Sequence, residues 1–219
     1  MIDILPVMDI IKFRNFAYDV ILSHRLTYPV NILNVVDNFS HLYDYASLKQ
    51  LCSEYGADDI KNCIDERGGD ALVLRLKSTG KHLVAFNEHT KAPEANWNIT
   101  HEAVHILLGH TKNKRILFST RYADDKKLED ITELVTLYIL CPDILVRELG
   151  LKWSNDISRF FNVPPHKVEK YAHYIYLDPI IYCMTPRLNA KVKAAFGKSI
   201  NEWKSQHDAE FSQELSIIV

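Results

Sequence analysis

Residues 93–109 have the sequence PEANWNITHEAVHILLG, which begins with a proline and ends with a glycine. Proline is favoured in the first turn of a helix, and glycine is the commonest residue just beyond the last turn. The residues between them follow a helical pattern. The stretch therefore predicts one long helix from Pro93 to Leu108, with Gly109 as its stop.

The middle of this predicted helix carries an H-E-x-x-H pattern at His101, Glu102 and His105. Residues four apart share one face of a helix, so the two imidazoles can bind a single Zn²⁺. Glu102 lies beside that face and can accept a proton from a metal-bound water. The alternative is a solvated histidine face, but the motif and its helical context together favour a zinc site.

His110 follows directly after Gly109. A third histidine ligand would need the longer spacing and the glycine turn of metzincins, so we do not expect His110 to bind the metal. A histidine near a helix C-terminus is more often an exposed group that the helix dipole favours. We prefer that interpretation here.

A second long helix is predicted from about Lys127 to Leu140, ending before Pro142. A zinc held by two histidines needs a third protein ligand, and this helix offers Glu129 and Glu133 on one face. One can bind the metal while the other orients a ligand imidazole. Taken alone, the pair is better explained as a solvated acidic patch at the start of a helix, and only the upstream H-E-x-x-H motif favours metal binding.

The rest of the chain predicts more helices and one β-hairpin, so the fold class is α+β, helix-rich with a small antiparallel sheet. The hairpin strands are expected at 71–76 and 82–86, around a turn at 78–80. The further helices are expected at about 8–24, 32–39, 142–149, 154–161, 165–176 and 186–219.

Composition and charge narrow the class of protein. The chain has 219 residues, of which 47% are hydrophobic, so global disorder is excluded. Its net charge of −2 provides no field for nonspecific phosphate binding. The four cysteines form no C-x-x-C pair, which argues against a disulfide framework. The start lacks a secretory pattern and the apolar runs are too short for a bilayer, so we expect a cytoplasmic protein without membrane contact.

Residues 97–110, WNITHEAVHILLGH, resemble the zinc helix of the ImmA/IrrE family of metallo-endopeptidases. The next helix is similar too, running from Glu129 to Leu140-Cys141-Pro142. By this register Glu129 corresponds to the family's third zinc ligand, whereas Glu133 falls where the family often has Asn or Asp. The resemblance covers roughly residues 70–176, including the segment Phe160–Pro164. It implies a zincin-like metallopeptidase domain, which we place at 1–149.

The remaining residues, 150–219, are expected to form a helical C-terminal region with a helix-turn-helix-like segment at 154–176. Its candidate DNA contacts are Arg159, His166, Lys167 and Lys170. The acidic residues Asp156 and Glu169 lower the positive charge of the same segment, so we do not expect direct DNA binding. We keep the docking of a protein partner on this segment as the alternative.

Two functions stand at this point. The resemblance implies a zinc-dependent endopeptidase that cleaves a specific cytoplasmic regulatory protein, a helix-turn-helix repressor, with Glu102 as general base. The alternative is a noncatalytic zinc-containing regulator that binds a protein partner or DNA. Glu102 favours the enzyme, because a purely structural zinc site needs no base. Tyr122 or His173 could stabilise the oxyanion, although neither has motif support. The sequence predicts no particular oligomeric state.

Overall fold

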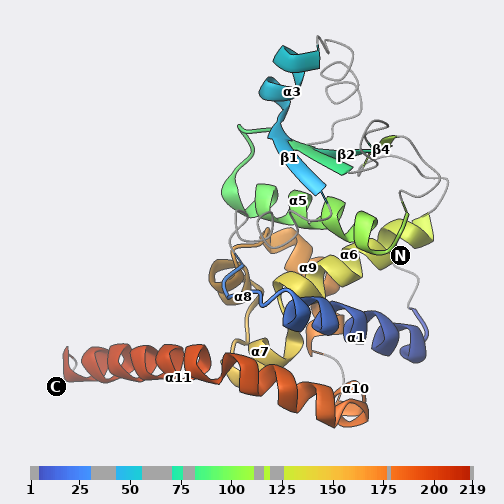
Figure 1. Cartoon of the computed structure of the whole chain (residues 1–219). Helices are drawn as coiled ribbons and strands as arrows, with labels where there is room; N and C mark the ends of the chain where they lie inside the picture. Colours follow the sequence, from blue (N-terminus) through green and yellow to red (C-terminus); the bar gives the residue numbers. More distant parts are fainter. Residues whose placement is uncertain are drawn as a thin grey trace.

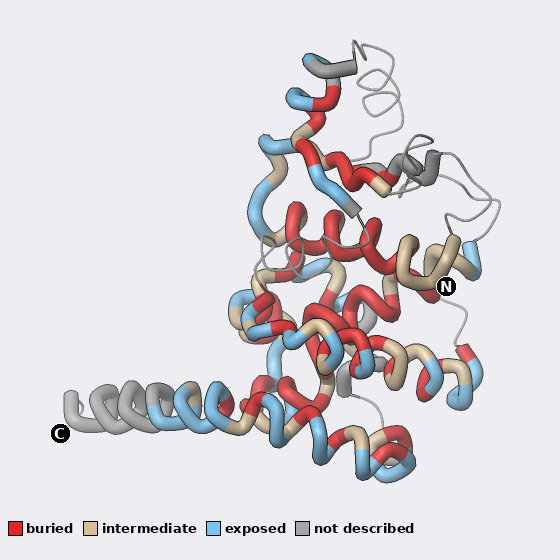
Figure 2. The backbone as a smooth tube through the Cα atoms, in the orientation of Figure 1, coloured by how far each residue is buried: buried red, intermediate tan, exposed pale blue. Residues whose placement is uncertain are grey.

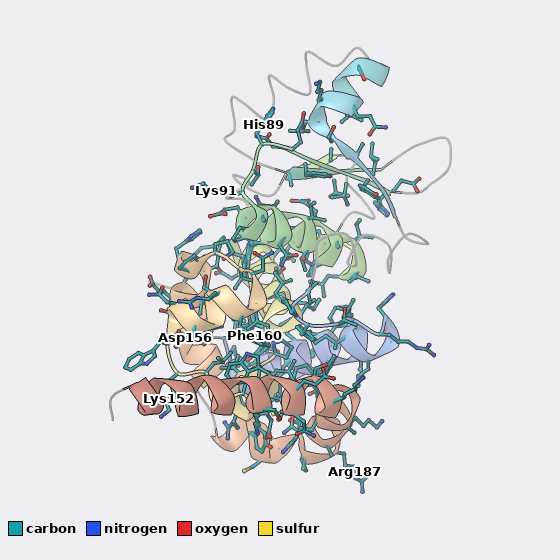
Figure 3. All side chains as sticks on the ribbon, turned by 90° about the vertical axis from the view of Figure 1, so that its left-hand side faces the viewer. His89, Lys91, Lys152, Asp156, Phe160 and Arg187 are labelled. Atoms are coloured by element: carbon teal, nitrogen blue, oxygen red, sulfur yellow. The ribbon has the colours of Figure 1, made fainter. Side chains whose placement is uncertain are left out.

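The computed structural model describes residues 5–30, 43–55, 71–75, 82–110, 116–118, 126–176 and 179–217. A small sheet lies on one side of helix α5 (Ala92–Leu107), and most of the other helices lie on its opposite side (Figure 1). The view turned by 90° shows the same stacking of sheet, α5 and lower helices (Figure 3). The protein is therefore helix-rich α+β, as predicted.

The sheet has four strands: β1 (Tyr43–Ser47), β2 (Ala71–Arg75), β3 (His82–Phe86) and β4 (Ile116–Phe118), in the order β1-β3-β2-β4. β2 pairs with β3 in antiparallel fashion, which confirms the strand pair expected at 71–76 and 82–86. The turn expected between them, at 78–80, lies outside the described residues.

The prediction of a purely antiparallel sheet is wrong, because β1 pairs with β3 in parallel. Parallel neighbours need a long crossover connection, and here the chain between β1 and β3 includes helix α3 (Leu48–Tyr55) and β2. Neither β1 nor β4 was predicted. The sheet is therefore mixed, with the hairpin at its centre and one added strand on each side.

The two helices expected to carry the metal ligands form where predicted, with α6 spanning Lys126–Leu140. Gly109, at φ 75°, ends α5 in a left-handed conformation that glycine adopts without strain. α5 and α6 pack against each other, and both are buried over much of their length (Figure 2). Their mutual packing fixes the spacing between the H-E-x-x-H motif and the acidic residues of α6.

Within the described residues the other predicted helices are also present, whereas α3 and α10 (Pro179–Met184) were not expected. The observed helices are α1 (Val7–Ser23), α7 (Asp143–Glu148), α8 (Ser154–Phe161), α9 (Pro165–Tyr176) and α11 (Pro186–Ile217). The helix expected at 32–39 lies outside the described residues. The end of α11 extends away from the body of the molecule (Figure 1). Among the described helices, none is both long and apolar enough to cross a membrane.

One hydrophobic cluster runs through the helical layer. It includes Val104 of α5 and Leu137 of α6 together with Phe161, Val168 and Phe196 from the C-terminal region. The division of the chain into 1–149 and 150–219 stays a prediction. Because the two parts share buried side chains, removing either would expose apolar surface on the other.

A buried polar cluster ties α1 to the C-terminal helices. The guanidinium of Arg14, fully buried, donates hydrogen bonds to Asp143 at 2.9 Å, Thr185 at 2.8 Å and Asn189 at 2.9 Å. Tyr18 donates to the same Asp143 carboxylate and accepts from Arg14. Burial is tolerated because every one of these contacts satisfies a donor or an ionised group.

Candidate metal centre

Three predicted metal ligands converge between α5 and α6: His101, His105 and Glu129. His101 and His105 come from consecutive turns of α5, and their rings meet edge to face with centroids 4.7 Å apart. Glu129 comes from the first turn of α6 and faces both rings. A group of this kind could hold a metal ion.

The spacing of the ligand atoms fits a tetrahedral ion. His101 Nε2 lies 3.0 Å from His105 Nε2 and 3.2 Å from Glu129 Oε2, and His105 Nε2 lies 3.5 Å from Glu129 Oε1. Zinc with ligands at about 2.0–2.2 Å and tetrahedral angles separates its ligand atoms by about 3.3 Å. The observed separations scatter around that value, so these side chains need little movement to receive the ion.

Burial and charge at the group also suit a cation. His101 is 4% exposed and His105 is 1% exposed, whereas the Glu129 side chain is 29% exposed. Burial by itself would raise the pKa of Glu129, but the hydrogen bonds from His101 and His105 outweigh it and lower that pKa to about 2. Glu129 is therefore an anionic ligand at neutral pH.

Glu133, the alternative ligand, lies away from this group. Its carboxylate accepts hydrogen bonds from Lys167 at 2.6 Å and from Lys170 at 2.5 Å, both on α9. The structure thus gives Glu133 a role between α6 and α9, and the expectation that it orients a ligand imidazole stays a prediction. Of the two acids that the sequence left open, Glu129 is the one beside the histidines.

The prediction that His110 is exposed at the helix end is wrong. The residue is half-buried, and its Nδ1 lies 3.0 Å from Nδ1 of His105. The signal that was missed is the glycine stop itself, because a Schellman-type turn at Gly109 folds the next residue back over the last turn of the helix. Among the described residues, the group that could hold a metal ion consists of His101, His105 and Glu129, and the expectation that His110 is no ligand stays a prediction.

Glu102, the predicted general base, is fully buried on α5 next to His101. Its burial places a carboxyl group within the layer that holds the metal ligands rather than on the solvated face of the helix. The two candidates for oxyanion stabilisation are not placed: Tyr122 lies outside the described residues, and the side chain of His173 is not described either.

The turn between α8 and α9 is docked onto the metal-bearing helices. Asn96 of α5 donates its side-chain amide to the carbonyl of Asn162 at 3.0 Å. The ammonium of Lys167 lies 5.0 Å from the ring centroid of the buried Trp97, also on α5. With the ion pairs to Glu133, these contacts fix α9 against both helices of the candidate metal centre.

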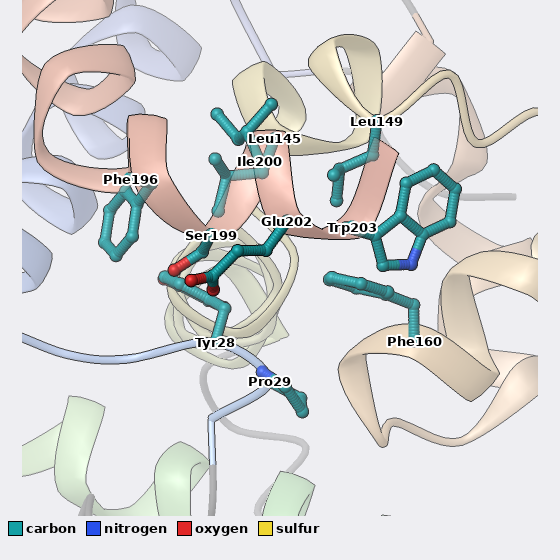
Figure 4. A pocket seen from close by; sticks show the side chains of 10 residues that line it. All are labelled: Tyr28, Pro29, Leu145, Leu149, Phe160, Phe196, Ser199, Ile200, Glu202 and Trp203. Atoms are coloured by element: carbon teal, nitrogen blue, oxygen red, sulfur yellow. The ribbon is translucent and has the colours of Figure 1, made fainter. Parts of the chain in front are cut away.

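A separate apolar pocket of about 220 Å³ lies beside α11 (Figure 4). Tyr28, Leu149, Phe160 and Trp203 form much of its wall, and the carboxylate of Glu202 points toward Ser199 and Tyr28. None of its lining residues belongs to the metal-binding group.

No protein-family model matches this chain, and no curated protein matches it.

Proposed function

We propose that this protein is a zinc-dependent endopeptidase that acts in the cytoplasm on a specific regulatory protein. The observation that carries the proposal is the convergence of His101, His105 and Glu129 around one position, with Glu102 in the same motif. The substrate class, a helix-turn-helix repressor, rests on the resemblance to the ImmA/IrrE family. The zincin-like character of the fold is part of the same proposal.

The donor set supports a catalytic rather than a structural ion. Structural zinc sites close all four positions with protein ligands, whereas catalytic sites keep one position open. Within the described part of the chain, the group contains three such ligands and no fourth. Two neutral imidazoles and one carboxylate are the donors that zinc hydrolases use.

In the proposed mechanism, zinc bound by these residues would supply Lewis-acid activation of a water molecule and of the peptide carbonyl. A carboxylate oxygen of Glu102 accepts the proton of the attacking water as the new C–O bond forms. Glu102 then returns that proton to the leaving amine as the C–N bond breaks, so no net proton is consumed. Glu129 and the two histidines hold their ligand atoms in place through both steps.

DNA binding, part of the alternative function, receives little support from the surface of α9. Lys167 and Lys170, two of its four candidate contacts, are engaged by the carboxylate of Glu133. A contact to phosphate would have to break these ion pairs first. The lysines are better explained as an attachment of α9 to α6.

The proposal is tested by a Glu102→Gln variant, which keeps the shape of the side chain and removes the base. We expect wild-type protein, mixed with the repressors encoded beside its own gene, to release a defined fragment from one of them. The Glu102→Gln variant should keep its zinc and lose at least about 10²-fold in cleavage rate. Glu94→Gln, on the first turn of the same helix, is the matched control and should cleave normally.

Cleavage at full rate by Glu102→Gln would remove this residue from the mechanism. Stable capture of a repressor by both proteins, with no fragment from either, would favour the noncatalytic regulator. The zinc content of the same preparations shows whether lost cleavage comes from lost metal or from the lost carboxylate of Glu102.

A further inference from the structure

The ring of His105 is contacted at both of its nitrogen atoms. Nε2 faces the metal-binding group, with His101 Nε2 at 3.0 Å and Glu129 Oε1 at 3.5 Å. Nδ1 faces the opposite way and lies 3.0 Å from Nδ1 of His110. A contact at each end fixes the rotation of the ring as well as its position.

The backbone that brings His110 to this position is itself fixed. The N–H of Gly109 donates to the carbonyl of Ile106 at 3.0 Å, and the N–H of His110 donates to the carbonyl of His105 at 3.0 Å. This bonding pattern requires the left-handed conformation that Gly109 adopts. The chain therefore returns over the last turn of α5 and presents the His110 ring to the His105 ring, with centroids 5.2 Å apart.

The same nitrogen of His110 also lies near α6. The hydroxyl of Thr132, a buried residue, lies 3.4 Å from His110 Nδ1. Thr132 donates its own proton to the carbonyl of Leu128 at 2.8 Å, so it does not donate that proton to the imidazole. Of these two contacts of His110 Nδ1, the one to Nδ1 of His105 is the shorter, at 3.0 Å.

We propose that His110 is a positioning residue that accepts the Nδ1–H of His105 and so holds the His105 Nε2 lone pair toward the metal. A histidine that binds metal through one nitrogen carries its proton on the other, and an acceptor there fixes the tautomer and raises the basicity of the ligand. Carboxylates and carbonyls usually fill this role, and here a neutral imidazole with its proton on Nε2 fills it. The inference rests on the proposed metal site, and it concerns metal affinity rather than turnover.

The test compares the zinc affinity of His110 variants by competition with a chromogenic chelator at fixed pH. His110→Ala should bind zinc about 10–100-fold more weakly than wild type, as expected for loss of a group that orients a ligand. His110→Asn, whose side-chain oxygen can accept at about the position of Nδ1, should recover most of that loss. His89→Ala is the matched control, since His89 is exposed, and it should bind zinc as wild type does.

A second measurement does not depend on the variants folding. In zinc-loaded wild-type protein with ¹⁵N-labelled histidine, NMR should show His105 protonated on Nδ1 and His110 protonated on Nε2. The opposite tautomer at either residue overturns the inference, as does unchanged affinity in His110→Ala, or a loss that His110→Asn does not recover. If wild-type protein itself binds no zinc, the proposed function fails first; if it binds zinc with any of these other results, only the role of His110 fails.

Discussion

Glu129 and Glu133 lie one helical turn apart on α6, yet their carboxylates serve different partners. Glu129 faces His101 and His105 on α5, whereas Glu133 accepts hydrogen bonds from Lys167 and Lys170 on α9. One helix thus contributes to the candidate metal centre with its first acid and to the attachment of the C-terminal region with its second. The consequences of this division can be measured separately.

Zinc content should distinguish the two acids. We expect purified wild-type protein to hold about one zinc per chain and Glu129→Ala to lose most of it, because the third of three ligands is removed. Glu133→Ala should retain zinc, since its carboxylate lies against the lysines. Mass spectrometry of the metal after dialysis measures this. A Glu133→Ala protein without zinc beside a Glu129→Ala protein with zinc would contradict the assignment.

The stability of the metal-free protein should depend on Glu129 in a defined pH range. The pKa of Glu129 is lowered from its ordinary value of 4.5 to about 2, so the folded state favours the ionised carboxylate more than the unfolded state does. Its contribution is complete above pH 4.5 and is lost as the pH falls toward 2. Urea unfolding of chelator-treated wild type and Glu129→Gln should therefore show a gap in stability that narrows across this range. A difference in the free energy of unfolding that grows as the pH falls would contradict the predicted direction of the effect.

Arg14→Met should strongly destabilise the fold. The substitution leaves the Asp143 carboxylate, already largely buried, without its cation, and removing one partner of such a pair costs about 3–5 kcal/mol. Thr185 and Asn189 lose a partner in the same step. Arg187→Met is the matched control, because Arg187 is exposed (Figure 3), and it should stay within about 0.5 kcal/mol of wild type. Equal unfolding midpoints for the two variants would rule out the buried cluster as a support of the fold.

Binding to DNA should be weak and insensitive to α9. We expect a fluorescent duplex to bind no more tightly than ordinary nonspecific association, with a Kd of about 10⁻⁴–10⁻⁶ M at physiological salt. Lys167→Met/Lys170→Met should leave this affinity unchanged, because Glu133 already engages both ammonium groups. Lys191→Met/Lys204→Met, at two exposed lysines of α11, is the control. Nanomolar binding that only the α9 variant abolishes would restore the DNA-binding alternative.

Much of the local structure could be read from the sequence. The helices at 154–161 and 165–176 begin and end as predicted. α5 begins and ends one residue earlier than predicted, and α6 begins one residue earlier. These boundaries depend on prolines, glycines and helical spacing, which act over a few residues. The H-E-x-x-H motif is of the same kind, because two histidines four apart share a helix face wherever that helix lies.

Only the tertiary structure decided the relationships between distant segments. Glu129 and Glu133 share one face of α6, so helical spacing could not separate them and only the family resemblance favoured Glu129. The packing of α6 against α5 and α9 gives each acid its partners. The parallel pairing of β1 with β3 and the contact of His110 with His105 depend in the same way on the path of the chain. Sequence patterns fix which residues share a face of one element, whereas the packing of several elements at once determines which faces meet.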